Sequence, residues 1–286
     1  MRDPREHLGP FYRLPRDFTV LDTETTGLPR KGVQPAIITM GLVQVVGGVI
    51  KAGKEIYTRP HLPIEASATR VHGYSDRQVR KDPQFRPFPE GWAVARPWLE
   101  GRYVVMHNQP YDWGALTAAL AYYKLPAVQA TTFCSLKATR KWAIAEGIVN
   151  KHSSRGARLD LLLEHLGVAE VRTGHHGALD DARLTFLAIN RLKQMAQAYK
   201  AAGGVFSDET PERKTTLHPG KPYYVVEYLD ASNRQNGDAV TIHALPAFLQ
   251  RALPKIRANR GIARAWYVLP RRDAADEVLY IVGGPK

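Results

Sequence analysis

The sequence predicts an α/β protein: a domain with a mixed sheet flanked by helices, followed by a small C-terminal α+β module. Strand-like runs come first in the chain and then alternate with helix-like runs, which is typical of a mixed sheet covered by helices. A polar stretch rich in glycine and proline then precedes a second, shorter series of strands. We therefore expect an N-terminal arm at 1–16, a main domain at 17–202, a linker at 203–222 and a module of unknown role at 223–286.

The main domain is expected to begin with three strands. The run DFTVLDTE extends from Asp17 to about Glu24 and is followed by the breakers Gly27 and Pro29. Residues 36–60 contain two further runs rich in β-branched residues, separated by a pair of glycines. We expect these runs to form two strands joined by a tight turn.

Helices are expected to make up most of the remaining domain. The apolar run at 103–108 is typical of a short buried strand, and Pro110 suits the first turn of the helix that follows it. Glycines mark two later boundaries, since Gly167 suits a helix C-cap and Gly203 stops a long final helix. The expected helices span 93–101, 111–125, 159–167 and 178–202.

The C-terminal module shows three strand-like runs and one helix-like run, at 245–261, which Pro254 could interrupt. The strands are expected at 223–230, 263–269 and 277–284. Basic residues near aromatics in this module could bind single-stranded nucleic acid, although the favoured interpretation is that the aromatics fill a small core with the charges in solvent. These residues are Arg251, Lys255, Arg257, Arg260, Arg264, Trp266 and Tyr267.

Composition and charge limit the class of protein. The 286 residues are 44% hydrophobic and 23% charged, which is ordinary for a soluble globular protein. No apolar stretch is long enough to span a bilayer, and the N-terminus lacks the apolar core of a signal peptide, so we expect a cytoplasmic protein without a membrane partner. The single cysteine, Cys134, is expected to be a buried thiol. A net charge of +13 favours a polyanionic partner, nucleic acid first, although many basic proteins bind none.

Paired acidic residues at the end of the first strand are the first candidate for a functional site. Asp22 and Glu24 are two positions apart, so on a strand their side chains point to the same face. Two carboxylates in this arrangement suit Mg2+ or Mn2+. Solvated acids at a polar strand end are an equally reasonable interpretation of this motif taken alone.

Two further motifs each have an ordinary structural explanation. Asp112 lies at the start of a predicted helix, where an acid stabilises the helix N-terminus. The stretch TGHHGALDDA contains two His–Asp pairs of equal spacing, His175 with Asp180 and His176 with Asp181. Such a loop is commonly solvated surface, and neither spacing nor helical periodicity chooses between the two pairs.

Taken together, the three motifs are far more specific. Their order resembles that of the DEDD exonuclease superfamily in its histidine-containing subgroup, the family of the proofreading subunit of bacterial DNA polymerase III. The segments ATRVHGYSDRQVRKDPQF and RLDLLLEHLGV also resemble family segments, and the resemblance covers about residues 17–200. It implies a ribonuclease H-like mixed sheet. Because the family has Gly-Ala after its histidine and a small residue after its last aspartate, it favours His176 with Asp181.

The resemblance implies roles for individual residues. Asp22, Glu24, Asp112 and Asp181 would hold two Mg2+ or Mn2+ ions, and His176 would be the general base that takes a proton from the attacking water. Contacts to the terminal nucleotide are expected from a further set of residues, each of which could instead be a packing or loop residue. This set comprises Thr23, Thr25, Leu28, His72, Tyr74, Asn108 and Tyr111.

The predicted function is metal-dependent 3′–5′ hydrolysis of DNA with release of nucleoside 5′-monophosphates. The alternatives are an exoribonuclease or oligonucleotide-degrading enzyme and, in another class, a nucleic-acid-binding or scaffold protein with a silent nuclease site. The segment 137–158 has six Lys or Arg and one acid. It could grip phosphates upstream of the cleaved bond or form a solvated face. The module at 223–286 could recruit a protein partner.

Overall fold

The computed structural model describes residues 3–30, 32–153, 156–168, 175–208, 223–228, 262–269 and 277–282. The chain divides into two compact units, at 1–209 and 210–286, which are considered separately. Among the described residues, none of the helices combines the length and the apolar character needed to cross a bilayer.

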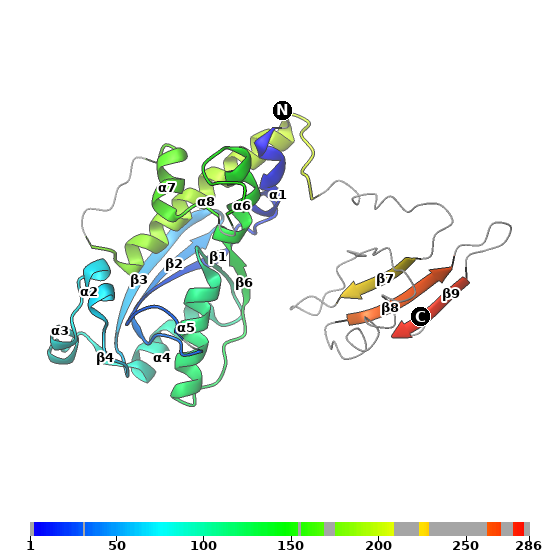
Figure 1. The fold of residues 1–286 in the computed structure, drawn as a ribbon. Helices are drawn as coiled ribbons and strands as arrows, with labels where there is room; N and C mark the ends of the chain where they lie inside the picture. The colour runs from blue at the N-terminus through cyan, green and yellow to red at the C-terminus, as the bar shows by residue number, and fades with distance from the viewer. Residues whose placement is uncertain are drawn as a thin grey trace. The chain divides into compact units, whose positions relative to one another are not determined.

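The first unit is built on a six-stranded mixed sheet in the order β4-β3-β2-β1-β5-β6 (Figure 1). The strands are β1 (Phe18–Thr25), β2 (Ile37–Val46), β3 (Val49–Arg59), β4 (Arg86–Pro87), β5 (Tyr103–Met106) and β6 (Thr131–Cys134). Strand β2 is antiparallel to both β1 and β3, while β5 is parallel to both β1 and β6. The predicted mixed sheet is therefore confirmed, and the expected glycine turn lies between β2 and β3.

Helices cover both faces of this sheet. On one face lie α6 (Ser135–Ala145), α7 (Leu159–His165) and the long α8 (Ala178–Ala201), while α4 (Phe88–Leu99) and α5 (Gln109–Tyr122) cover the other. Alternation along β1 divides its side chains between the two layers, since Val20 packs with the α8 layer and Leu21 with the α5 layer.

Several elements were not predicted from the sequence. Two short helices, α2 (Ala66–His72) and α3 (Asp76–Lys81), follow β3, and α4 begins five residues earlier than expected. The element α6 and the short strands β4 and β6 were also missed. Short elements like these are stabilised by tertiary packing, so local periodicity is a weak signal for them.

The N-terminal residues pack against the first unit. The 3-10 helix η1 (Pro4–Leu8) and α1 (Gly9–Tyr12) contact α6 and α8, and Leu8 and Phe11 are fully buried. Phe206, which lies beyond α8 in the expected linker, is also fully buried and packs against Tyr12. The ends of the unit therefore pack on each other.

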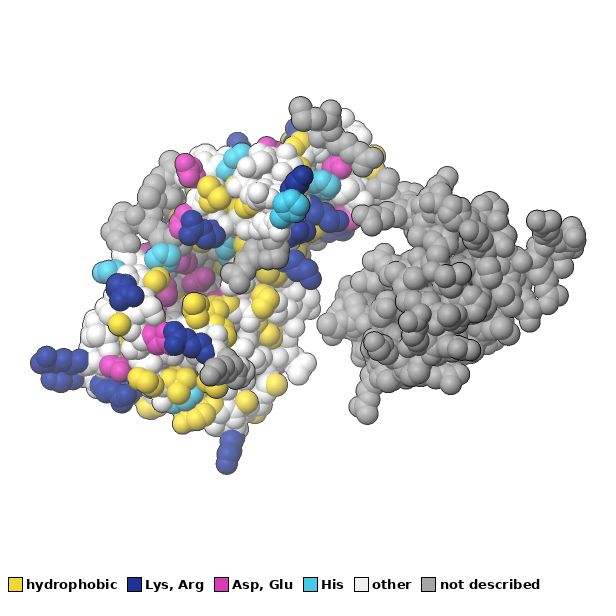
Figure 2. Space-filling view, viewed as in Figure 1, with side chains coloured by type: hydrophobic (Ala, Val, Ile, Leu, Met, Phe, Trp, Pro, Cys, Tyr) yellow, Lys and Arg dark blue, Asp and Glu magenta, His cyan; other side chains and the backbone are white. Residues whose placement is uncertain are grey.

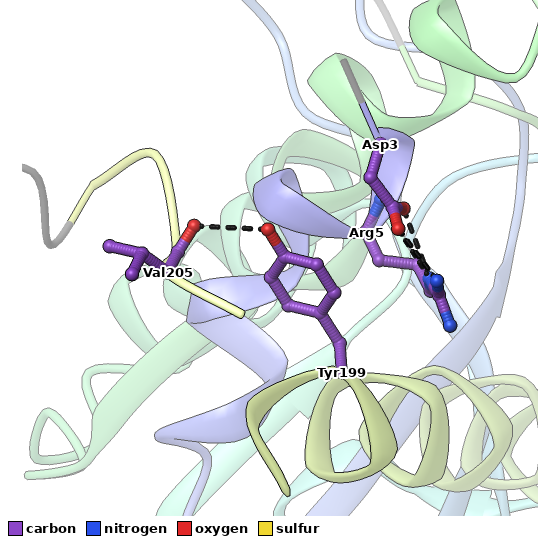
Figure 3. Close-up of polar contacts among 4 residues, drawn as sticks. All are labelled: Asp3, Arg5, Tyr199 and Val205. Carbon is purple, nitrogen blue, oxygen red and sulfur yellow. Dashed lines mark hydrogen bonds and ion pairs between the residues drawn. The ribbon is translucent and has the colours of Figure 1, made fainter. Parts of the chain in front are cut away.

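Polar contacts join the same two ends of the unit (Figure 3). The Tyr199 hydroxyl, from the last turns of α8, donates a hydrogen bond to the Val205 carbonyl at 3.2 Å. Arg5 forms an ion pair with Asp3 at 2.6 Å, and its guanidinium lies 5.5 Å from the centre of the Tyr199 ring. These contacts add to the apolar burial that holds residues 3–14 in place.

The described part of the second unit is an antiparallel sheet in the order β7-β8-β9. Its strands are β7 (Tyr223–Tyr228), β8 (Ile262–Leu269) and β9 (Glu277–Val282), at the three positions predicted from the sequence. The helix expected at 245–261 lies outside the described residues, as does most of the expected linker.

Candidate active site

The acidic pair lies at the carboxyl end of β1, in the centre of the sheet. Asp22 and Glu24 share the face covered by α8, as their spacing predicts, and Glu24 is buried. The intervening Thr23 and the following Thr25 face α5 on the opposite side. The strand therefore directs two carboxylates to one layer and two hydroxyls to the other.

Asp112 reaches the same strand from the first turn of α5. Its Oδ1 accepts two hydrogen bonds from Thr23, one from the backbone nitrogen at 3.1 Å and one from the hydroxyl at 2.8 Å. Burial raises the pKa of Asp112 to about 7; the hydrogen bonds from Thr23 oppose this shift, and the negative charge of Asp181 adds to it. Such a buried carboxyl is well placed to become ionised when a cation binds beside it.

The structure brings one of the two His–Asp pairs to the acidic strand. His176 Nδ1 lies 3.1 Å from Asp181 Oδ2, and Asp181 is buried on the first turn of α8. Glu24, His176 and Asp181 each offer one potential ligand atom, and these three atoms lie within 4.8 Å of one another. His175 and Asp180, the other pair, are exposed.

Helix α2 supports the histidine loop. The backbone nitrogen of His176 donates a hydrogen bond to the Val71 carbonyl at 3.1 Å. His175 lies over the turn that ends α2, because a Cβ added at Gly73 would be 3.0 Å from its ring. Sequence reasoning did not identify α2 as an element of the site.

A glycine in β2 allows α8 to approach the sheet. A Cβ added at Gly41 would lie 2.0 Å from the backbone carbonyl carbon and oxygen of Ala178, the first residue of α8. Gly41 pairs with Asp22 across the two strands, so this close approach is beside the acidic pair. A glycine inside a predicted strand was the available sequence signal, since it often marks a close backbone contact.

A cavity of about 450 Å3 is lined by all five of the predicted catalytic residues. In Figure 2, acidic side chains gather in a hollow between α2 and α5, with Lys and Arg side chains on the surrounding surface. Three further polar residues line this cavity: His107 and Asp160, which sequence reasoning missed, and Arg158, the last residue of the basic segment 137–158. His107 lies 3.0 Å from the Ser135 hydroxyl and 3.1 Å from the Ala157 carbonyl, so it links the end of β5 to α6 and to the start of α7.

The predicted substrate contacts divide among three places. Thr23 and Asn108 line the acidic cavity, and a neighbouring cavity of about 220 Å3 is lined by Thr25, Leu28, His72 and Tyr111. Tyr74 is not among the residues lining either cavity. Its ring packs edge-on against Tyr57 and Phe85.

Tyr111 lines both cavities, but its hydroxyl is used in internal hydrogen bonds. The hydroxyl donates to the Gly27 carbonyl at 2.8 Å and also contacts the Thr25 hydroxyl. Burial raises the pKa of Tyr111 to about 12, so the phenol stays neutral. Tyr111 is a predicted contact to the terminal nucleotide, and its hydroxyl holds the loop after β1.

The chemistry of this donor set fits a divalent cation. Carboxylate oxygens from the end of β1 and from the first turns of α5 and α8 converge on one cavity beside an imidazole, which is the arrangement expected for a metal-dependent hydrolase. The fold and the site thus define a class: an α/β enzyme with an acidic, histidine-containing centre at the carboxyl ends of its strands.

The family follows from comparison with known proteins. A family model described as Exonuclease matches residues 19–188, more than half of the chain, so the protein belongs to this exonuclease family and contains a hydrolytic nuclease domain. Among curated relatives, DNA polymerase III subunit epsilon of Pasteurella multocida (strain Pm70) is 28% identical over 169 residues, covering 58% of this chain and 63% of the relative. The subunit of Escherichia coli (strain K12) is 29% identical over 170 residues, covering 58% and 66%. The chain therefore spans less than two thirds of the length of these relatives.

The fold is also similar to that of a solved structure. Escherichia coli exonuclease I in complex with a 5cy-dA13 oligonucleotide has a TM-score of 0.50 at 14% identity, covering 74% of this chain and 48% of that one. The nuclease domain of 3′hExo, described as a DEDDh family member bound to rAMP, has a TM-score of 0.49 at 18% identity, covering 64% and 94%. The likeness to exonuclease I confirms the expected ribonuclease H-like class.

Proposed function

We propose that this protein is a metal-dependent 3′–5′ exonuclease that hydrolyses DNA from its 3′ end and releases nucleoside 5′-monophosphates. One observation supports this proposal above all. The four acids Asp22, Glu24, Asp112 and Asp181 line a single cavity with His176, in a domain of the exonuclease family. The names of the relatives favour DNA as the substrate.

The carboxylates would hold two Mg2+ or Mn2+ ions. Asp22, Glu24 and Asp181 would hold the ion on the α8 side, and Asp112 would help to hold the second from the α5 side. Such ions supply charge stabilisation for the leaving oxygen and lower the pKa of a bound water. The two hydrogen bonds from Thr23 keep the Asp112 carboxylate oriented for this role.

His176 is proposed as the general base. Its Nδ1 faces Asp181, so a neutral ring with the proton on Nδ1 presents Nε2 as the proton acceptor. The side chain is 38% exposed, which suits a group that passes a proton on to solvent. The hydrogen bond from its backbone to Val71 positions the ring over the acidic cavity.

The smaller cavity is proposed to hold the terminal nucleotide. It shares Glu24, Val71 and Tyr111 with the acidic cavity, so a base bound there would place its phosphate beside the carboxylates. Leu28 is 69% exposed at its edge and offers an apolar contact to the base. The roles that fit this activity are proofreading, repair and end trimming, and we place them in the cytoplasm. The second unit is proposed as a protein-docking module.

A gel time course tests the proposal directly. The substrates are 5′-labelled single-stranded DNA, duplex DNA with a paired or mismatched 3′ end, and a matching RNA, each with Mg2+, Mn2+ or EDTA. We expect a metal-dependent ladder that shortens from the 3′ end, fastest on DNA. Faster shortening of RNA would assign the exoribonuclease activity, and no shortening with either metal would reject the enzyme in favour of a binding or scaffold role.

A further inference from the structure

A third cavity, of about 540 Å3, lies between the N-terminal segment and α6. Lys137, Arg140 and Lys141 of α6 line it together with Pro10 of α1 and Gln109 of α5. None of these five residues lines the acidic cavity, and the three basic ones belong to the segment 137–158 that the sequence suggests could grip phosphates. Figure 2 shows Lys and Arg side chains near α1 and α6.

Sheet topology places this cavity next to the acidic centre. The parallel strands β1, β5 and β6 end at the same edge of the sheet, and Met106 of β5 pairs with Cys134 of β6, which also lines the cavity. Neighbouring strands are about 4.8 Å apart, so the end of β6 is on the order of 10 Å from the end of β1. Gln109 directly follows Asn108, which lines the acidic cavity.

The three cavities therefore follow one another along the sheet edge. The proposed terminal-nucleotide cavity lies beside β1 and α2, the acidic cavity lies at β1 and β5, and the third cavity lies at β6 and α6. A strand whose last nucleotide lies in the first cavity and whose scissile phosphate lies in the second has the third available for its upstream part.

The charge of the cavity suits a phosphodiester backbone. Lys137 and Lys141 are exposed and are four positions apart on α6, so they lie on one face of the helix with Arg140 beside them. The acidic residue in the lining, Asp208, forms an ion pair with Arg13. The wall thus presents a net positive charge to a polyanion.

We propose that this cavity binds the sugar–phosphate backbone of the substrate strand on the 5′ side of the cleaved bond. The inference rests on the proposed exonuclease function and adds a strand-binding site to it. The side of the cavity that includes Pro10 comes from the N-terminal segment, which lies outside residues 19–188, the range matched by the exonuclease family model. Burial of Leu8 and Phe11 holds that side in place.

The test compares a substrate with an upstream strand and one without. In the full-length protein, Lys137→Ala/Lys141→Ala is assayed on dT12 and on the p-nitrophenyl ester of thymidine 5′-monophosphate, which has no upstream nucleotide. We expect KM for dT12 to rise about tenfold more than KM for the ester. The slope of log KM for dT12 against log salt should fall by about 1 to 2.

The control is Lys51→Ala/Lys54→Ala, which removes two exposed lysines from β3, away from the three cavities. It should leave both substrates unaffected. Equal effects of Lys137→Ala/Lys141→Ala on dT12 and the ester, or no effect on dT12, would overturn the strand-binding site.

A binding measurement distinguishes failure of the proposed strand-binding site from failure of the proposed exonuclease function. Fluorescein-labelled dT12 is titrated into Asp22→Ala protein, with and without the two α6 substitutions, and followed by anisotropy. We expect the α6 substitutions to raise the Kd for dT12 about tenfold. If the unmodified protein cleaves neither substrate, the exonuclease proposal fails, and equal binding by the two proteins in this titration overturns the strand-binding site.

Discussion

Two adjacent His–Asp pairs occupy very different environments in this protein. Asp181 is buried, and His176 lies beside it and beside Glu24, whereas His175 and Asp180 are exposed one position earlier in the chain. The residue types and the spacing are the same. The difference in burial follows from which face of α8 meets the acidic strand.

Replacing one aspartate of each pair should give the largest contrast. Asp181→Asn removes a negative charge and a proposed metal ligand from the acidic cavity. It should lower kcat by about 1000-fold, because metal-held charge stabilisation is worth several kcal/mol. Asp180→Asn should change kcat by less than about twofold. Initial rates on single-stranded DNA at saturating Mn2+ measure both. Comparable losses would mean that burial of Asp181 has no functional meaning.

The histidines should differ in the same direction with a smaller magnitude. His176→Ala removes the proposed general base, a contribution of about 100-fold to 10000-fold, while metal binding remains. His175→Ala should retain nearly full activity, since this ring lies over the turn at Gly73. The pair is compared by kcat, with the circular dichroism spectrum as a check of folding. A severe loss only in His175→Ala would show that the other register is the catalytic one.

Moving α8 should weaken the distinction between the pairs. Gly41→Ala places a methyl group where the backbone of Ala178 lies, so the first turn of α8 must shift away from Asp22. A displacement on the order of 1 Å at a reacting centre can cost about 100-fold in rate. We expect that loss, together with a higher Mn2+ concentration for half-maximal activity.

Gly53→Ala is the matched control for this substitution. Gly53 lies on β3, and its added Cβ would be 3.3 Å from the flexible end of the Leu179 side chain rather than from backbone. It should therefore leave activity and the Mn2+ requirement near those of the unmodified protein. Urea denaturation of both variants separates a shift of α8 from a general loss of stability.

The smallest loss of activity is expected from a substitution on the face of β1 that packs against α5. Thr23→Val removes the 2.8 Å hydrogen bond to Asp112 but keeps the backbone bond, and a hydrogen bond to a charged group is worth about 1.5–3 kcal/mol. We expect about a tenfold to hundredfold loss in kcat. Thr19→Val is the control, because its hydroxyl bonds the Trp98 carbonyl away from the site. Equal activity of the two variants would show that Thr23 does not orient Asp112.

Much of the fold could be predicted from local patterns. The strands at β1, β2 and β3 and the helices α5, α7 and α8 have clear periodicity or end signals, and the predicted boundaries lie within a few residues of those observed. The common face of Asp22 and Glu24 follows from the two-residue repeat of a strand. These features depend on neighbours in the chain, so the sequence by itself determined them.

Other features were decided only by tertiary structure. Asp112 is buried and accepts a hydrogen bond from Thr23, 89 positions away. His107 contacts Ser135 of α6 and Ala157 before α7, which are 28 and 50 positions away. The N-terminal segment and Phe206 pack together although they lie at opposite ends of the unit. The rotation of α8 that selects Asp181 is determined by its packing on β1 and β2. Such contacts join residues that are distant in the chain, and no local period encodes which of two equally spaced pairs will be buried.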